Sequence, residues 1–159
     1  LDGGHLGPNP GFFNRRLIDE RLDIAVFQTN VLNSDLHFSG IPYFETSVSS
    51  DSETFDICLA LSVVDKNEEI VKQFSTGFLR TKAFPTDNEK IYSVEFQPTN
   101  ITIRKGEIMR LSIAASAWPA IGVNSGIHGK RFGFPTSLHR VITLNFDLSK
   151  TIMKIKPFF

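Results

Sequence analysis

A serine flanked by glycines is the first candidate for chemistry in this chain. Residues 122–126 read Gly-Val-Asn-Ser-Gly, close to G-x-S-x-G, the strained turn that lifts a nucleophilic serine above a parallel sheet. The serine stands one position late, and no parallel strand precedes it. We therefore interpret the segment as a glycine-rich loop, and we expect no catalytic residue in this chain.

The other candidate ligands do not have the spacing of a metal site. The histidines His5, His37, His128 and His139 lack the i, i+4 spacing of a helical zinc site, which favours solvated or singly hydrogen-bonded imidazoles over a cluster formed only in three dimensions. Residues 49–56 carry oxygens that could bind calcium, but they lack the order of a dedicated calcium loop. That segment favours a polar hairpin, and we expect neither metal nor cofactor.

Two single residues have alternative interpretations. Cys58 is the only cysteine and lies in an apolar run, so a small buried hydrophobic side chain is favoured over a reactive thiol. Trp118 is the only tryptophan and precedes Pro119, which biases its backbone toward an extended conformation. It either fills the core or contacts a ligand or a neighbouring domain, because tryptophan is enriched at interfaces.

The elements that must position these residues are strands. Residues 108–115 alternate apolar and polar or small side chains with a period of two, as does the segment from Phe55, in which Ile57, Leu59 and Leu61 share one face. About nine candidate strands are bounded by turn residues: 23–29, 42–50, 55–64, 70–74, 78–82, 91–97, 108–115, 141–147 and 151–155.

No segment shows the apolar stripe of a convincing helix, although residues 19–21 could begin a helical turn. Half-buried strands joined by short loops predict an all-β fold, an antiparallel β-sandwich with jelly-roll wiring preferred over an immunoglobulin type. Residues 1–21 are expected to form an extended connecting arm and residues 22–159 the sandwich. Phe12 and Phe13 are too apolar for a free linker and are expected to lie on the domain or on a neighbour.

Composition excludes several partners. The chain of 159 residues has 17 basic and 17 acidic residues and no net charge, so nothing in it attracts a polyanion, and we expect no binding to nucleic acid. No apolar run approaches the ~20 residues that span a bilayer, and no secretory signal is visible, so we expect no membrane contact and a cytoplasmic location. The chain begins at Leu1 without methionine, from which we expect a missing upstream part.

Several segments, in their order along the chain, resemble a known family. They are GGHLGPNP (3–10), NRR (14–16), RLDIAVF (21–27), LHFSG (36–40), VSSD (48–51), FD (55–56), GFLR (77–80), IRKG (103–106) and ASAWP (115–119). Together they resemble the C-terminal domain of the CocE/NonD (cocaine-esterase-like) hydrolases and X-Pro dipeptidyl-peptidases. Two departures stand out: residues 64–69 lack the family's usual Asp-Pro-Asp-Gly-like turn, and Ala120 stands where relatives have a basic residue.

The resemblance implies a galactose-binding-like jelly-roll that follows an α/β-hydrolase domain and a helical cap. The parent protein would be a serine hydrolase of the esterase or dipeptidyl-peptidase type, whereas this chain alone would not be an enzyme. Its partner would be the catalytic domain, with homo-oligomer contacts also implied. We expect Phe55, Arg80 and Trp118 to contact the substrate pocket or an interface; the alternative is a stand-alone interaction or carbohydrate-binding module.

Overall fold

The structure is a computed structural model that describes residues 13–67, 69–81, 90–127, 133, 136–137 and 139–158. Its elements in chain order are β1 (Phe13–Asn14), α1 (Arg16–Asp19), β2 (Ile24–Gln28), β3 (Leu36–Ser50), β4 (Asp56–Val64), β5 (Val71–Arg80), β6 (Lys90–Glu95), β7 (Thr99–Ile103), β8 (Ile108–Ala114) and β9 (Leu144–Pro157).

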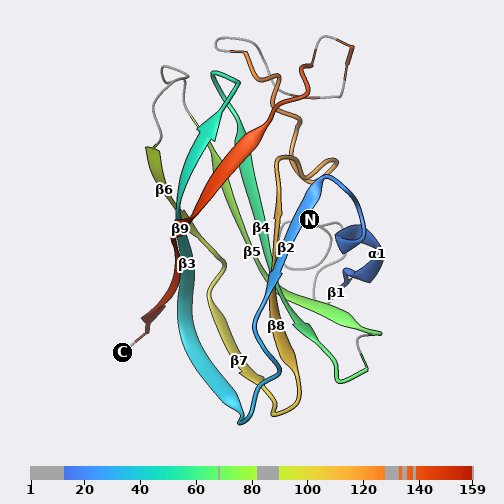
Figure 1. Ribbon diagram of the computed structural model, residues 1–159, viewed down its shortest axis with the longest axis vertical. Helices are drawn as coiled ribbons and strands as arrows, with labels where there is room; N and C mark the ends of the chain where they lie inside the picture. Colours follow the sequence, from blue (N-terminus) through green and yellow to red (C-terminus); the bar gives the residue numbers. More distant parts are fainter. Residues whose placement is uncertain are drawn as a thin grey trace.

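The strands form two antiparallel sheets. The five-stranded sheet has the order β1-β5-β4-β8-β2, and in the four-stranded sheet β3 pairs with β6, β7 and β9. The four-stranded sheet lies at the left of Figure 1, and α1 lies outside the five-stranded sheet, on the side away from β3. The predicted all-β antiparallel sandwich is therefore confirmed, while its jelly-roll wiring and galactose-binding-like character remain predictions.

The core lies between the two sheets. Phe44, Val48 and Val94 come from the four-stranded sheet, and they pack against inward side chains of β4 and β8, namely Ile57, Leu59, Leu61 and Ile113. Each of these side chains is at most 3% exposed. Alternation along β4 therefore identified the inward face of this strand correctly. The other face of β4 is also largely covered, so all nine residues of the strand are buried.

Three strands run through segments that resemble turns in the sequence. β5 joins the two strands predicted at 70–74 and 78–82, because Ser75, Thr76 and Gly77 are buried between neighbours and not in a loop. β9 likewise joins the strands predicted at 141–147 and 151–155, with a register shift opposite 45–47. β7 is not among the predicted strands, because Pro-Thr-Asn at 98–100 resembles a turn; residues 99–103 nevertheless pair with the first half of β3.

The segment that precedes β2 is attached to the five-stranded sheet. β1 pairs with β5, and α1 forms a single helical turn where the sequence gives no convincing helix. The turn is held by tertiary contacts, described below, and not by an apolar stripe of its own. Residues 1–12 of the predicted arm, with His5 and Phe12, lie outside the described residues, as does His128.

Gly40 lies where β3 passes from β7 to β9, pairing with Thr99 on one side and Pro157 on the other. A Cβ added there would overlap the backbone carbonyl oxygen of Lys156. We expect Gly40→Ala to lower the free energy of unfolding by ~1–3 kcal/mol, since a strand must shift to admit the methyl group. Urea unfolding monitored by circular dichroism measures this. Gly133→Ala, with nothing within 4 Å of the new methyl group, is the control and should leave stability almost unchanged.

Candidate functional site

Small side chains leave a hollow on the outer face of the five-stranded sheet. On this face Cys58 of β4 lies opposite Ala114 of β8, and Ala60 opposite Ser112. No large side chain rises from these positions to fill the space above the sheet. The hollow has a volume of about 260 Å³, and its walls are the α1 segment with the start of β2 on one side and residues 118–120 on the other.

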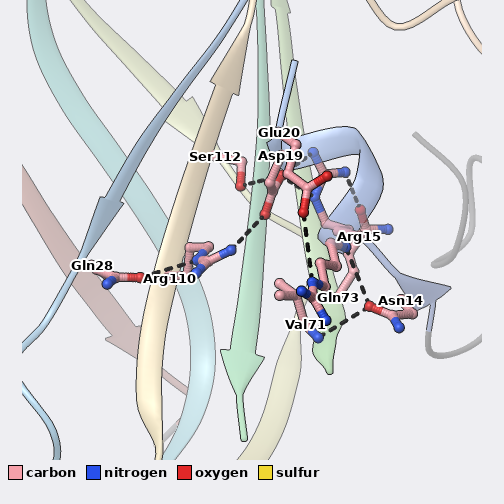
Figure 2. Close-up of polar contacts among 10 residues, drawn as sticks. Asn14, Arg15, Asp19, Glu20, Gln28, Val71, Gln73, Arg110 and Ser112 are labelled. Atoms are coloured by element: carbon pink, nitrogen blue, oxygen red, sulfur yellow. Dashed lines mark hydrogen bonds and ion pairs between the residues drawn. The ribbon is translucent and has the colours of Figure 1, made fainter. Parts of the chain in front are cut away.

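The first wall is held to the sheet by its own polar side chains (Figure 2). The Arg15 guanidinium donates to Oε1 of Gln73 on β5 at 2.7 Å and lies 3.1 Å from the carboxylate of Asp19. The Asn14 side-chain oxygen accepts the backbone N–H of Val71 at 3.1 Å. These bonds attach the first described residues of the chain to the face of the sheet that carries the hollow.

Asp19 is the centre of this network (Figure 2). Its carboxylate, only 2% exposed, also accepts the Ser112 hydroxyl at 2.9 Å and lies 3.4 Å from the Arg110 guanidinium. Arg110 in turn donates to Oε1 of Gln28 on β2. Burial lowers the pKa of Arg15, and the charge of Asp19 opposes this shift.

The second wall, the loop that carries Trp118, is held by another ion pair. Asp56 on β4 accepts two hydrogen bonds from Arg80 on β5, at 2.8 and 2.6 Å. Arg80 also donates to the carbonyl oxygen of Gly122, and the Asn124 amide donates to Asp56 at 2.9 Å. The hydrogen bonds that Arg80 donates to Asp56 raise the pKa of Arg80. We call Asp56, Arg80, Gly122 and Asn124 the loop clasp.

The same loop contains the serine flanked by glycines. The Ser125 hydroxyl accepts the backbone N–H of Ile127 at 3.3 Å, a local turn, and Ser125 is 5% exposed. Gly126 has a φ of +74°, which favours glycine, and its carbonyl oxygen accepts the Ser52 hydroxyl at 2.6 Å. The segment is the loop that its sequence predicts, and its polar groups hold the loop in place.

The three residues predicted to contact a pocket or an interface are in different environments. Phe55 is 4% exposed and packs edge-to-face on Tyr92, with 5.5 Å between ring centroids, so the structure buries it in the core and does not bring it to the surface. Arg80 is in the loop clasp. Trp118 is 41% exposed and lines the hollow. Trp118 thus belongs to the loop at residues 117–127, and Arg80 of β5 holds that loop through the Gly122 carbonyl oxygen.

The sequence analysis did not identify the polar residues that build both walls, in particular Arg15, Asp19, Asp56 and Asn124. The sequence offered one signal for this network: Arg110 is a charged residue among small ones on the outward face of its strand. Such a residue indicates that something covers this face of the sheet. Its partner, Asp19, comes from a segment 91 residues away in the chain.

Other classes of site find no support within the described ranges. No group of three or more histidine, cysteine, aspartate or glutamate side chains there is placed to hold a metal ion. Asp51, in the segment that could have bound calcium, accepts the backbone N–H of Thr143 instead. Among the same residues, no helix is long and apolar enough to cross a membrane.

Cys58 lies in the floor of the hollow and is 3% exposed. Burial, with a smaller contribution from the charge of Asp56, raises the pKa of its thiol to about 12. At pH 8 the thiolate fraction is then on the order of 10⁻⁴, against roughly 0.1 for a thiol of ordinary pKa. This environment supports the interpretation of Cys58 as a small buried side chain.

We expect the native chain to react with Ellman's reagent at pH 8 about 10³-fold more slowly than the chain in urea, because only the thiolate attacks. Since the folded pKa is raised, this thiol contributes stability below pH ~9 that is lost as the pH rises toward 12. Cys58→Ala should remove that part of the pH dependence. Complete labelling of the native chain by Ellman's reagent within seconds would contradict the raised pKa of the Cys58 thiol.

Comparison with known proteins gives one family and several similar structures. The model of the X-Pro dipeptidyl-peptidase C-terminal non-catalytic domain matches residues 7–145, which is most of the chain. No curated protein is significantly similar in sequence. Among solved structures, an aminopeptidase from a marine sediment archaeon, Thaumarchaeota archaeon, is 17% identical with a TM-score of 0.80, and the match covers 90% of this chain and 27% of that one.

Two further solved structures share the fold. An α-amino acid ester hydrolase is 15% identical with a TM-score of 0.81, over 89% of this chain and 26% of that chain. A CocE/NonD family hydrolase from Staphylococcus aureus is 14% identical with a TM-score of 0.59, over 77% of this chain and 28% of that one. At these identities the likeness concerns the fold alone. The chain spans about a quarter of the length of each of these three proteins.

Proposed function

Because the chain belongs to the family of X-Pro dipeptidyl-peptidase C-terminal non-catalytic domains, we propose that it serves as the β-domain of a serine hydrolase of the esterase or dipeptidyl-peptidase type. In this role it packs on an α/β-hydrolase catalytic domain of the same polypeptide. It helps to shape the substrate pocket or an oligomer interface, and it takes no part in bond cleavage.

The family match over residues 7–145 is the observation that carries this proposal. The three similar structures, all of hydrolases, support it, since each is almost four times as long as the part that this chain matches. The arrangement of polar groups is consistent with a non-catalytic role. Asp19 and Asp56 are both engaged with arginines, and the Ser125 hydroxyl is bound to a neighbouring backbone N–H.

A rigid β-sandwich suits this role physically. Its side chains can restrict solvent beside a reaction centre and supply apolar contacts that select a substrate, without providing a nucleophile or a base. Arg80 and Trp118 remain our candidates for such contacts, because Trp118 lies in a loop that Arg80 holds from β5 while paired with Asp56. Phe55 is buried against Tyr92 and could contribute only indirectly, from the core.

Enzyme assays test the proposal. The chain alone should hydrolyse nitrophenyl esters and X-Pro anilides no faster than buffer. Turnover that a serine-directed fluorophosphonate abolishes would refute the non-catalytic assignment. The coding sequence upstream of Leu1 gives the second test, since it should encode G-x-S-x-G followed by an aspartate and a histidine; an upstream region without them would contradict the serine hydrolase.

A further inference from the structure

We propose that the hollow beside Trp118 is the surface on which the upstream catalytic domain docks, with Trp118 as the anchor and an apolar side chain of the catalytic domain inserted into the hollow. This inference rests on the proposed function. It goes beyond it by naming the face, the anchor and the chemistry of the partner surface.

The size and composition of the hollow determine what it can hold. Its volume of about 260 Å³ lies below the ~300–1,000 Å³ of small-molecule sites, so it suits a single side chain better than a substrate. Its floor consists mainly of small or apolar residues, among them Cys58, Ala60 and Ala114. Of the charged residues that line it, Arg21 and Asp23 are paired with each other at 2.6 Å, and Arg15 is paired with Asp19 at 3.1 Å. An apolar centre with a paired polar rim is the composition of a protein–protein interface.

Large apolar side chains are exposed around the hollow. Trp118 forms part of the wall and is 41% exposed. Leu22, between the rim residues Arg21 and Asp23, is fully exposed, and Leu17 of α1 is 79% exposed. Tryptophan is the residue most enriched among those that dominate binding energy, and its rigid ring loses little entropy on docking.

The loop clasp preorganises this anchor. Arg80 holds the Gly122 carbonyl oxygen and Asp56 holds Asn124, so the loop is fixed at two points close after Trp118 in the chain. A fixed loop loses less entropy on association than a free one, which raises affinity. Arg80 is thus a positioning residue, which acts on the interface through the loop.

The path of the chain indicates that the domain upstream in the polypeptide occupies the hollow. Residues 13–19 are bound to the same sheet by β1 pairing and by the Arg15–Asp19 network. A domain that precedes them in the polypeptide is therefore tethered beside the hollow, where even a weak contact has a high effective concentration. The opposite sheet also exposes large apolar side chains, namely Ile91, Leu148, Ile152 and Ile155. It is the poorer candidate because residues 13–19, the first described part of the chain, are bound to the five-stranded sheet. In addition, the exposed residues of β9 alternate with charged side chains such as Lys154, which is paired with Glu45.

Hydroxyl-radical footprinting of the intact polypeptide and of the isolated chain, read by mass spectrometry, tests this surface. We expect the modification rate of Trp118 to be roughly fivefold or more lower in the intact polypeptide, because docking buries the exposed part of its ring. Leu22 should be protected with it. Ile91 on β6, 65% exposed and on the other sheet, is the internal control and should react equally in both samples.

Variants of the intact polypeptide add a second readout. Trp118→Ala should restore the Leu22 modification rate to that of the isolated chain, whereas Ile91→Ala should not. The Trp118 side chain lies outside the buried core clusters, so the variant is expected to fold, and circular dichroism checks this. Arg80→Ala should give an intermediate Leu22 rate, and Arg80→Lys should recover part of the protection.

The outcomes separate the two proposals. Protection of Ile91 in place of Trp118 would overturn the docking surface and leave the proposed function intact. Equal rates at every residue in the two samples would overturn both, since the chain would then not pack on the rest of the polypeptide. A gene that encodes nothing upstream of this chain would also overturn both.

Discussion

Asp19→Ala should lower the free energy of unfolding by ~3–5 kcal/mol, because it leaves a buried guanidinium without its counter-charge. The Arg15 side chain is 5% exposed and the Arg110 side chain 14%, and both depend on this carboxylate. The Ser112 hydroxyl loses its acceptor as well. Urea unfolding of the 159-residue chain, followed by circular dichroism, measures the effect.

Glu20→Ala is the matched control. Glu20 is the next residue along the chain and pairs with Arg16 in the same i, i+4 geometry, but these side chains are 60% and 51% exposed. Its loss should change stability by no more than ~0.5 kcal/mol. If the two variants were equally stable, the buried network would contribute nothing to holding α1 on the sheet, and the first wall of the hollow would need another explanation.

Asp56→Ala should destabilise the chain by ~2–4 kcal/mol and free the loop that carries Trp118. The effect is smaller than that of Asp19→Ala, since the Arg80 side chain is 22% exposed and can turn toward solvent. Because Trp118 is the only tryptophan, its fluorescence reports on this loop alone. We expect acrylamide to quench the Trp118 emission more strongly in the variant, under conditions where the chain stays folded.

Glu45→Ala provides the comparison for Asp56. It also removes the carboxylate of an ion pair with a basic side chain, Lys154, but on the four-stranded sheet and with 33% and 46% of the two side chains exposed. Quenching of Trp118 should stay at its original value in this variant. Unchanged quenching in Asp56→Ala as well would show that the clasp does not position the loop, and the role given to Arg80 would be lost.

The strands that the sequence predicts best are those whose two faces differ. In β4 and β8 the inward positions carry large apolar residues, and the outward positions carry small or polar ones except at the Val64–Ile108 pair, so a period of two is visible. β5 and β9 were divided in the prediction, because Ser, Thr and Gly within them resemble turn residues. Pairing with β4 and β3 satisfies their backbone groups and keeps these strands continuous.

For the site, the sequence suggested Phe55, Arg80 and Trp118, which the structure places in the core, in the loop clasp and beside the hollow. An aromatic residue at the start of a strand is equally compatible with a surface loop and with the core. Burial of Phe55 depends on Tyr92 of β6, which the fold brings from another sheet. The same reason explains why Asp19 was not identified: its importance comes from Arg110 and Ser112, which belong to a strand about ninety residues later.

The sequence by itself determined that this chain is an antiparallel β-protein and to which family it belongs, because side-chain alternation and ordered short motifs are properties of neighbouring residues. Only the tertiary structure decided that small residues on β4 and β8 form the floor of a hollow. It also decided that two buried carboxylates, Asp19 and Asp56, each hold one of its walls. The Asp19–Arg110 and Asp56–Arg80 ion pairs join residues 91 and 24 positions apart in the chain. Their strength comes from burial, which exists only once the sheets have packed.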